Sequence, residues 1–184
     1  MASWGSCDFS QLQKLRGDME KLQRVDVQKF CEDASRELAA RLLALVIPHT
    51  PVGKTLKEAD ETGKIRTVHM GGTLRRGWTA KTEAEAEKRG SAQSGAEYAK
   101  TLPVEKSGDT YQITVINPVH YASYVEFGHR QTPGRYVPAI GKQLKQGWVE
   151  GQYMLTLSER QLSELAPALL EKKLQAFLTE VFNG

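Results

Sequence analysis

Four histidines are the residues of this sequence best suited to metal binding or proton transfer. They are His49, His69, His120 and His129, and they are scattered among segments that read as turns and loops. None belongs to an H-E-x-x-H pattern or to a comparable metal-ligand spacing. Glycine-rich phosphate loops, dinucleotide fingerprints and nucleophile elbows are also missing from the sequence. We therefore expect no metal site and no cofactor.

Glu126 is a carboxyl group with chemically interesting neighbours, because His129 and Arg130 follow it closely. Acid–base catalysis by a hydrolase would also need a nucleophile or a water site, and no motif supplies one. The simpler interpretation is that Glu126 forms an ion pair or accepts hydrogen bonds from backbone N–H groups. The sequence thus predicts a protein that is not an enzyme, and a hydrolase is the last of the alternatives.

Basic side chains form the second set of candidate functional residues. Between Gly128 and Trp148 every formal charge is positive, and the dipeptide Pro133-Gly134 marks a turn within this basic loop. Arginines beside aromatic residues are typical of protein interfaces, and they also suit phosphates and bases. The net charge of +3 is too mild to demand a nucleic-acid ligand, so a small nucleic-acid-binding module is the alternative function. The candidate interface residues are Arg75, Arg76, Arg130, Arg135, Lys142 and Lys145.

A cluster of large apolar residues immediately precedes the basic loop. Tyr121, Tyr124, Val125 and Phe127 lie within seven residues, and the offset of three between the tyrosines indicates a short helical turn. Gly128 ends this turn. We expect these four side chains to be mostly buried at the heart of the fold, in which case replacing Phe127 with alanine would cost about 3 to 5 kcal/mol.

Two helices are predicted before this point. Apolar residues recur at offsets of three and four in the range 8–23, where Asp8 or Ser10 would cap the helix. A second stripe runs from Val27 to Ile47, with Asp26 as the N-cap and Pro48 as the stop. From Thr50 to Gly72 the periodicity disappears, which predicts a long polar loop. Such a loop is either a flexible insertion or an arm that orders against a neighbouring subunit.

Strands are expected in the middle of the chain. The range 74–82 and the range 97–106 fit a first and a second strand, joined by a polar hairpin tip at 83–95, and the alternation from Asp109 to Asn117 gives the clearest strand. After the basic loop, a helix is expected near Tyr153, and a final helix has Pro167 in its first turn. The predicted fold class is α+β, with an antiparallel sheet flanked by N-terminal and C-terminal helices and with long interface loops.

A single domain covers residues 1–184 in this interpretation. It comprises N-terminal helices (1–49), an extended loop (50–73), a sheet with the aromatic turn (74–127), and the basic loop with C-terminal helices (128–184). Cys7 and Cys31 form no C-x-x-C pair, so we expect reduced thiols. The first residues lack a signal-peptide pattern and no apolar run reaches the roughly 20 residues of a membrane helix, so no membrane partner is expected.

The aromatic turn also carries a family resemblance. The run Y-A-S-Y-V-E-F-G at 121–128 resembles the Tyr-Ala-x-Tyr-Val-Glu-x-Gly signature of a tailed-phage family of minor tail, tail-completion or neck proteins, which join head to tail. The run G-T-L-R-R-G-W at 72–78 is similar to the family's Thr-Gly-x-Leu-Arg-x-Ser segment, with its first two residues reversed, and T-P-V at 50–52 resembles the preceding piece. The chain departs from the family by an insertion at 52–70 and by a long tail after 135–139.

This resemblance implies a structural protein of a phage or of a phage-tail-like particle, assembled in the cytoplasm of a bacterial host. It implies an oligomeric ring, most simply of six copies because the family joins six-fold tails, that acts as a neck, collar, tail-completion or tail-terminator ring. The expected partners are further copies of the chain, the head connector, and the tail tube, sheath or terminator, with DNA passing through the ring. The six candidate interface residues would then contact neighbouring subunits or rings.

Overall fold

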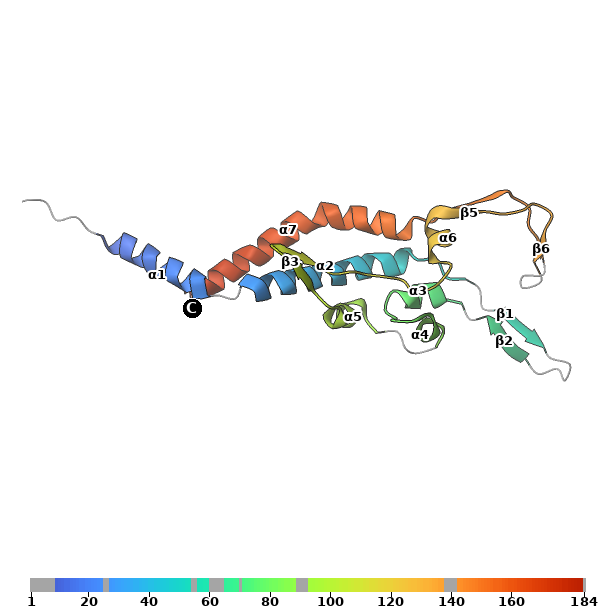
Figure 1. The fold of residues 1–184 in the computed structure, drawn as a ribbon, viewed down its shortest axis with the longest axis horizontal. Coiled ribbons are helices and arrows are strands. Elements are labelled where there is room, and N and C mark those ends of the chain that lie inside the picture. The colour runs from blue at the N-terminus through green and yellow to red at the C-terminus, as the bar shows by residue number, and fades with distance from the viewer. Residues whose placement is uncertain are drawn as a thin grey trace, which may run out of the picture.

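Two long helices run side by side along the molecule (Figure 1). The computed structural model describes residues 9–24, 27–53, 56–59, 65–69, 71–88, 93–137 and 142–183. The long helices are α2 (Val27–His49) and α7 (Met154–Asn183), while α1 (Ser10–Arg24) projects from the end where the chain terminates. The expected helices at 8–23 and 27–47 are therefore present, but α2 continues through Pro48, the expected stop, to His49. The proposed caps Asp8 and Asp26 lie outside the described residues.

Contacts between α2 and α7 are apolar and ionic. The rings of Phe30 and Phe177 lie 4.6 Å apart, and the Lys173 ammonium donates a 2.9 Å hydrogen bond to a carboxylate oxygen of Glu37. That hydrogen bond holds the pKa of Glu37 below its ordinary value, against the opposing effect of burial. The two helices are thus joined along most of the length of α2, with Leu43 and Val46 fully buried farther along.

The core lies where α2 meets the start of α7 and the short helix α3 (Thr73–Gly77). Trp78 is 3% exposed, and its indole Nε1 donates a 2.7 Å hydrogen bond to the hydroxyl of Thr50. That hydroxyl in turn donates to the carbonyl of Val46 at 2.7 Å. Because the only polar atom of the Trp78 side chain is hydrogen-bonded, this large side chain is buried without an unsatisfied group.

Short helices replace the first two expected strands. The range 74–82 begins in α3, and the range 97–106 begins in α5 (Gly95–Thr101). The hydroxyl of Ser94 accepts a hydrogen bond from the N–H of Glu97, whose side chain accepts one from the N–H of Ser94. This reciprocal capping stabilises a helix start and outweighs the strand propensity of the following residues. Between them, the expected hairpin tip holds α4 (Glu83–Glu87), capped by Thr82.

Strands form four antiparallel pairs within the part of the chain that the structure describes. The clearest expected strand, at 109–117, is present only in part as β4 (Thr110–Gln112), which pairs with β3 (Glu105–Ser107), and residues 113–117 lie outside any strand. The expected polar loop contains a hairpin of β1 (Leu56–Ala59) and β2 (Ile65–His69). Figure 1 shows this hairpin standing away from the helices, at the end of the molecule opposite α1. The α+β class is confirmed, with small hairpins in place of one larger sheet.

Helix α7 is continuous through Pro167, whereas two separate helices were expected. An internal proline removes one backbone hydrogen bond and costs about 3 kcal/mol. Packing on α2 on both sides of the proline opposes this cost, since Ser158 hydrogen-bonds His49 before it and Lys173 bonds Glu37 after it. The helix bends along its length in Figure 1, as helices do at an internal proline.

No helix among the described residues is long and apolar enough to cross a membrane.

Candidate interface site

Glu126 joins the aromatic turn to the start of the last helix. It belongs to α6 (Ala122–Phe127) and is 4% exposed. One carboxylate oxygen accepts a hydrogen bond from the N–H of Leu155 at 2.9 Å; the other accepts from the N–H and the hydroxyl of Thr156 at 2.9 and 2.7 Å. These N–H groups lie in the first turn of α7, where no intrahelical acceptor is available and where the helix dipole favours an anion. The expectation that Glu126 accepts backbone hydrogen bonds is confirmed.

Two glycines allow the chain to approach itself closely at this junction. Gly128 has a φ of 83°, and a Cβ at this position would lie 2.4 Å from the carbonyl oxygen of Val149. A Cβ on Gly151 would lie 2.3 Å from the carbonyl oxygen of Glu126. Backbone hydrogen bonds from Gln152 and Tyr153 to residues 125 and 126 complete the junction. As expected, Gly128 ends the aromatic turn, and the turn is fixed rigidly to α7.

Replacing Glu126 with alanine is expected to lower the free energy of unfolding by about 2 to 3 kcal/mol, because two N–H groups of α7 lose their acceptors. Urea unfolding followed by circular dichroism measures the change. Glu164→Ala is the matched control on α7, since the side chain of Glu164 is 71% exposed, and it should change the stability by less than about 0.5 kcal/mol. Equal effects of the two substitutions would show that Glu126 has no special structural role.

The aromatic side chains of this junction are only partly buried, which corrects the expectation of a buried cluster. Tyr121 and Val125 are half-buried against the core, but Tyr124 is 57% and Phe127 62% exposed. The reason is that α6 packs one face on the core, while Tyr124 and Phe127, three residues apart, share the other face. Trp148, Tyr153 and Leu157 are also exposed and lie close to this junction in sequence. We call the five exposed residues together the aromatic patch: Tyr124, Phe127, Trp148, Tyr153 and Leu157.

Because Phe127 is largely exposed, its replacement by alanine should lower the free energy of unfolding by less than about 1 kcal/mol, instead of the 3 to 5 kcal/mol of a core residue. For a chain of this size the melting temperature would then fall by no more than about 2 to 4 °C. Differential scanning calorimetry measures the shift. A much larger fall in the melting temperature would indicate that Phe127 is a core residue.

The basic loop forms a hairpin that we call the basic arm, residues 128–150. Its base pairs β5 (Gly128–Arg130) with β8 (Trp148–Glu150), and its outer part pairs β6 (Tyr136–Val137) with β7 (Lys142–Gln143). Backbone hydrogen bonds between these pairs keep the two strands together. Figure 1 shows the arm extending from α6 beyond the ends of the long helices. Arg130, Arg135 and Lys145 are exposed on it, whereas the side chain of Lys142 lies outside the described residues.

Arg75 and Arg76 make contacts within the chain. Arg75 donates to the carbonyl of Thr50 through two nitrogens, at 2.7 and 3.1 Å, beside the last turn of α2. Arg76 donates to the carbonyl of Ala86 at 2.7 Å and to that of Gly71 at 3.1 Å, which ties α3 to α4. Both guanidinium groups therefore donate hydrogen bonds to carbonyl oxygens of their own chain. Their expected role in contacts between chains stays a prediction.

Three of the four histidines have described side chains, each with a different partner, and the side chain of His69 lies outside the described residues. His49 Nδ1 lies 2.9 Å from the hydroxyl of Ser158, and His120 Nδ1 lies 2.6 Å from a carboxylate oxygen of Glu83. His129 Nε2 lies 3.1 Å from the side-chain amide of Gln131 in the basic arm. Among the described residues, no group of three or more His, Cys, Asp or Glu side chains is arranged to hold a metal ion.

The junction thus exposes the aromatic patch at the base of the basic arm. Comparison with protein families identifies the class to which the chain belongs. Residues 13–128 match the HK97-gp10-like family, described as "Bacteriophage HK97-gp10, putative tail-component". The match covers more than half of the chain, so the chain belongs to this family and is a phage tail-associated structural protein. No curated protein and no solved structure matches the chain significantly.

The matched range ends at Gly128, at the base of the basic arm. It contains the aromatic turn and the arginines of α3, but the arm, Trp148, Tyr153 and the whole of α7 lie beyond it. The features that extend this chain past the matched range are thus the arm and the long C-terminal helix.

Proposed function

We propose that this protein forms a closed ring in a phage or phage-tail-like particle, where it joins the head connector to the tail tube or caps the tail. The observation that carries the proposal is the basic arm, which projects from the helices and exposes Arg130, Arg135 and Lys145 beside the aromatic patch. A projecting arm has no core of its own and is stabilised by contacts with another chain. Membership in a family of tail components supports this assignment.

The chemistry of the arm fits an acidic protein surface. From Gly128 to Trp148 the arm has no carboxylate, so a neighbouring acidic ring would meet uncompensated positive charge. The patch beside it contains Tyr, Trp and Phe side chains, which are enriched at the centres of protein interfaces. We assign the arm and the aromatic patch to contacts with adjacent rings of the particle, and the ring to six copies, in keeping with six-fold tails.

The mechanism in this proposal is geometric and involves no catalysis. The junction at Glu126 fixes the aromatic patch and the base of the arm on α7, so a ring of such subunits would present them at constant height and angle. The hairpin of β1 and β2 offers a second projection at the same end of the molecule. Two projections per copy would hold the adjacent ring in one register. DNA passing through the ring would touch the arms only weakly.

The test is a three-dimensional map of the assembled particle by electron cryomicroscopy. We expect this chain in a closed ring on the tail axis, with residues 128–150 against a neighbouring chain. Copies that form no closed ring, or arms that point away from every neighbour, would contradict the proposal.

A salt-dependent gel shift with non-specific duplex DNA tests the alternative, a nucleic-acid-binding module. Tight binding at physiological salt, with a steep loss as salt rises, would favour the alternative. Binding that is absent at physiological salt is the result that the ring proposal expects.

A further inference from the structure

Helix α1 exposes an apolar stripe that no described part of the chain covers. Phe9, Leu12, Leu15 and Met19 recur at offsets of three and four, and each remains between 56% and 60% exposed. α1 contacts α7, yet Figure 1 shows that most of α1 extends past the neighbouring ends of α2 and α7. An amphipathic helix in water gains most of its stability from packing this face. The stripe therefore calls for an apolar partner.

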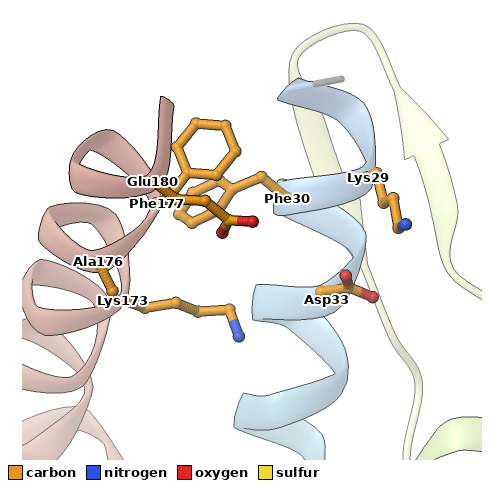
Figure 2. A pocket seen from close by; sticks show the side chains of 7 residues that line it. All are labelled: Lys29, Phe30, Asp33, Lys173, Ala176, Phe177 and Glu180. Carbon is orange, nitrogen blue, oxygen red and sulfur yellow. The ribbon is translucent and has the colours of Figure 1, made fainter. Parts of the chain in front are cut away.

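A groove suited to such a stripe lies between α2 and α7, near the end from which α1 projects. Its volume is about 420 Å³, and Phe30, Phe177 and Ala176 form its apolar part. Figure 2 shows the rings of Phe30 and Phe177 meeting between the two helices, while Lys173 reaches from α7 toward α2. Both phenylalanines are only half-buried, so their apolar surface is incompletely covered within the chain.

The charges that border the two surfaces are compatible. The groove has Lys29 and Asp33 on its α2 side and Glu180 on its α7 side. On α1, Arg16 and Asp18 lie between Leu15 and Met19 of the stripe in sequence, and Arg16 forms an exposed ion pair with Glu20. A helix docked in the groove would thus meet both signs of charge at the rim and apolar side chains at the centre, which is the usual arrangement of a protein interface.

We propose that α1 of one copy docks in the α2–α7 groove of the next copy. This contact rests on the proposed ring and names the surfaces that would join neighbouring subunits. Stripe and groove are different surfaces of one chain, so the contact is heterologous, and repetition of a heterologous contact closes a ring when the rotation allows it. Each copy would dock its own α1 in the groove of one neighbour and accept the α1 of the other neighbour in its own groove.

The size of the contact agrees with a ring better than with a dimer. The stripe contributes four large side chains, against the roughly 20 to 30 residues that one partner contributes to a standard interface. A single contact of this size is weak. Ring closure strengthens it, because the last contact forms within an assembly that already holds the chains together.

Disulfide trapping between differently tagged chains tests the contact. In full-length chains with Cys7 and Cys31 changed to serine, one tagged chain carries Leu12→Cys and the other carries Ala176→Cys. Mixing them in concentrated solution under mild oxidation should give a disulfide between the two tags. The matched control replaces Leu12→Cys with Leu165→Cys, at an α7 position that is 53% exposed and does not line the groove. We expect at least about tenfold more cross-linked product for the Leu12 pair.

Cross-linking equal to the control would overturn the proposal. So would a chain carrying both Leu12→Cys and Ala176→Cys that forms its disulfide only internally, because α1 would then fold back on its own groove. A second measurement uses Leu12→Gln with Leu15→Gln, which alters exposed positions only and should weaken self-association in sedimentation velocity about tenfold or more. Unchanged self-association would likewise reject this contact.

The map of the particle separates this contact from the proposed function. A closed ring whose neighbours meet through other surfaces would reject the docking of α1 and leave the ring intact. Trapping at Leu12 and Ala176 in a protein that is absent from the particle would support the contact and reject the ring's place in the tail.

Discussion

Replacement of Trp78 by alanine is expected to lower the free energy of unfolding by about 3 to 5 kcal/mol, the range for removing a large aromatic side chain from a core. Trp78 is 3% exposed and belongs to the main cluster of buried residues. Its loss leaves a cavity between α2, α3 and the start of α7. The change also removes the hydrogen bond from the indole to Thr50, whose hydroxyl still has the carbonyl of Val46 as a partner. The cavity therefore dominates the effect.

Equilibrium unfolding in guanidinium chloride, followed by far-ultraviolet circular dichroism, measures this change. Trp148→Ala is the matched control, because Trp148 is 46% exposed and should cost about 1 kcal/mol or less. Trp78→Phe keeps most of the volume and should fall between the two. A Trp78→Ala protein as stable as Trp148→Ala would mean that the core lies elsewhere.

The helices of this fold can be predicted from the sequence because their apolar residues recur with a clear period. α1 and α2 are found within a few residues of their expected bounds. The strands expected at 74–82 and 97–106 are wrong because the segments are too short for periodicity to decide. The capping pair Ser94 and Glu97 was the sequence signal that identifies α5 as a helix.

Continuity of α7 through Pro167 could not be predicted from local sequence. A proline is equally compatible with the first turn of a new helix and with the interior of a long one, and the local cost favours the first. The outcome depends on packing against α2, more than 100 residues earlier in the chain, as the contact between Lys173 and Glu37 illustrates. Contacts between segments so far apart leave no mark in the local pattern.

At the candidate site the sequence anticipated the hydrogen bonding of Glu126 but not the exposure of the aromatic side chains. The sequence left an ion pair and backbone hydrogen bonds open as roles of Glu126, and the structure shows the hydrogen bonds. The exposure of Phe127 could not be predicted, because a cluster of large apolar residues looks the same in the sequence whether it belongs to a core or to an interface. Only the orientation of α6 on the core separates the two. The same ambiguity applies to Arg75 and Arg76, which bond to carbonyl oxygens of their own chain.

Charge reversal in the basic arm is expected to have the largest effect on assembly. In the variant with Arg130→Glu and Arg135→Glu, two exposed cations of each copy become anions. If the arm contacts an acidic neighbour, each reversed residue juxtaposes like charges, which costs several kcal/mol at an interface. Six copies repeat the penalty around the ring. We therefore expect the yield of joined particles to fall by about 100-fold or more, while the protein itself folds normally, because exposed substitutions typically change stability by less than about 0.5 kcal/mol each.

Complementation of a particle that lacks the gene, with joined particles counted by electron microscopy, measures this effect. The matched control reverses Lys100 and Lys172, two lysines exposed on α5 and α7, and it changes the net charge by the same amount. The control should assemble nearly as well as the unaltered protein, since its positions lie outside the arm. Normal assembly with the reversed arm would contradict an acidic docking surface. Equal failure of both variants would show that net charge matters and that the arm has no specific partner.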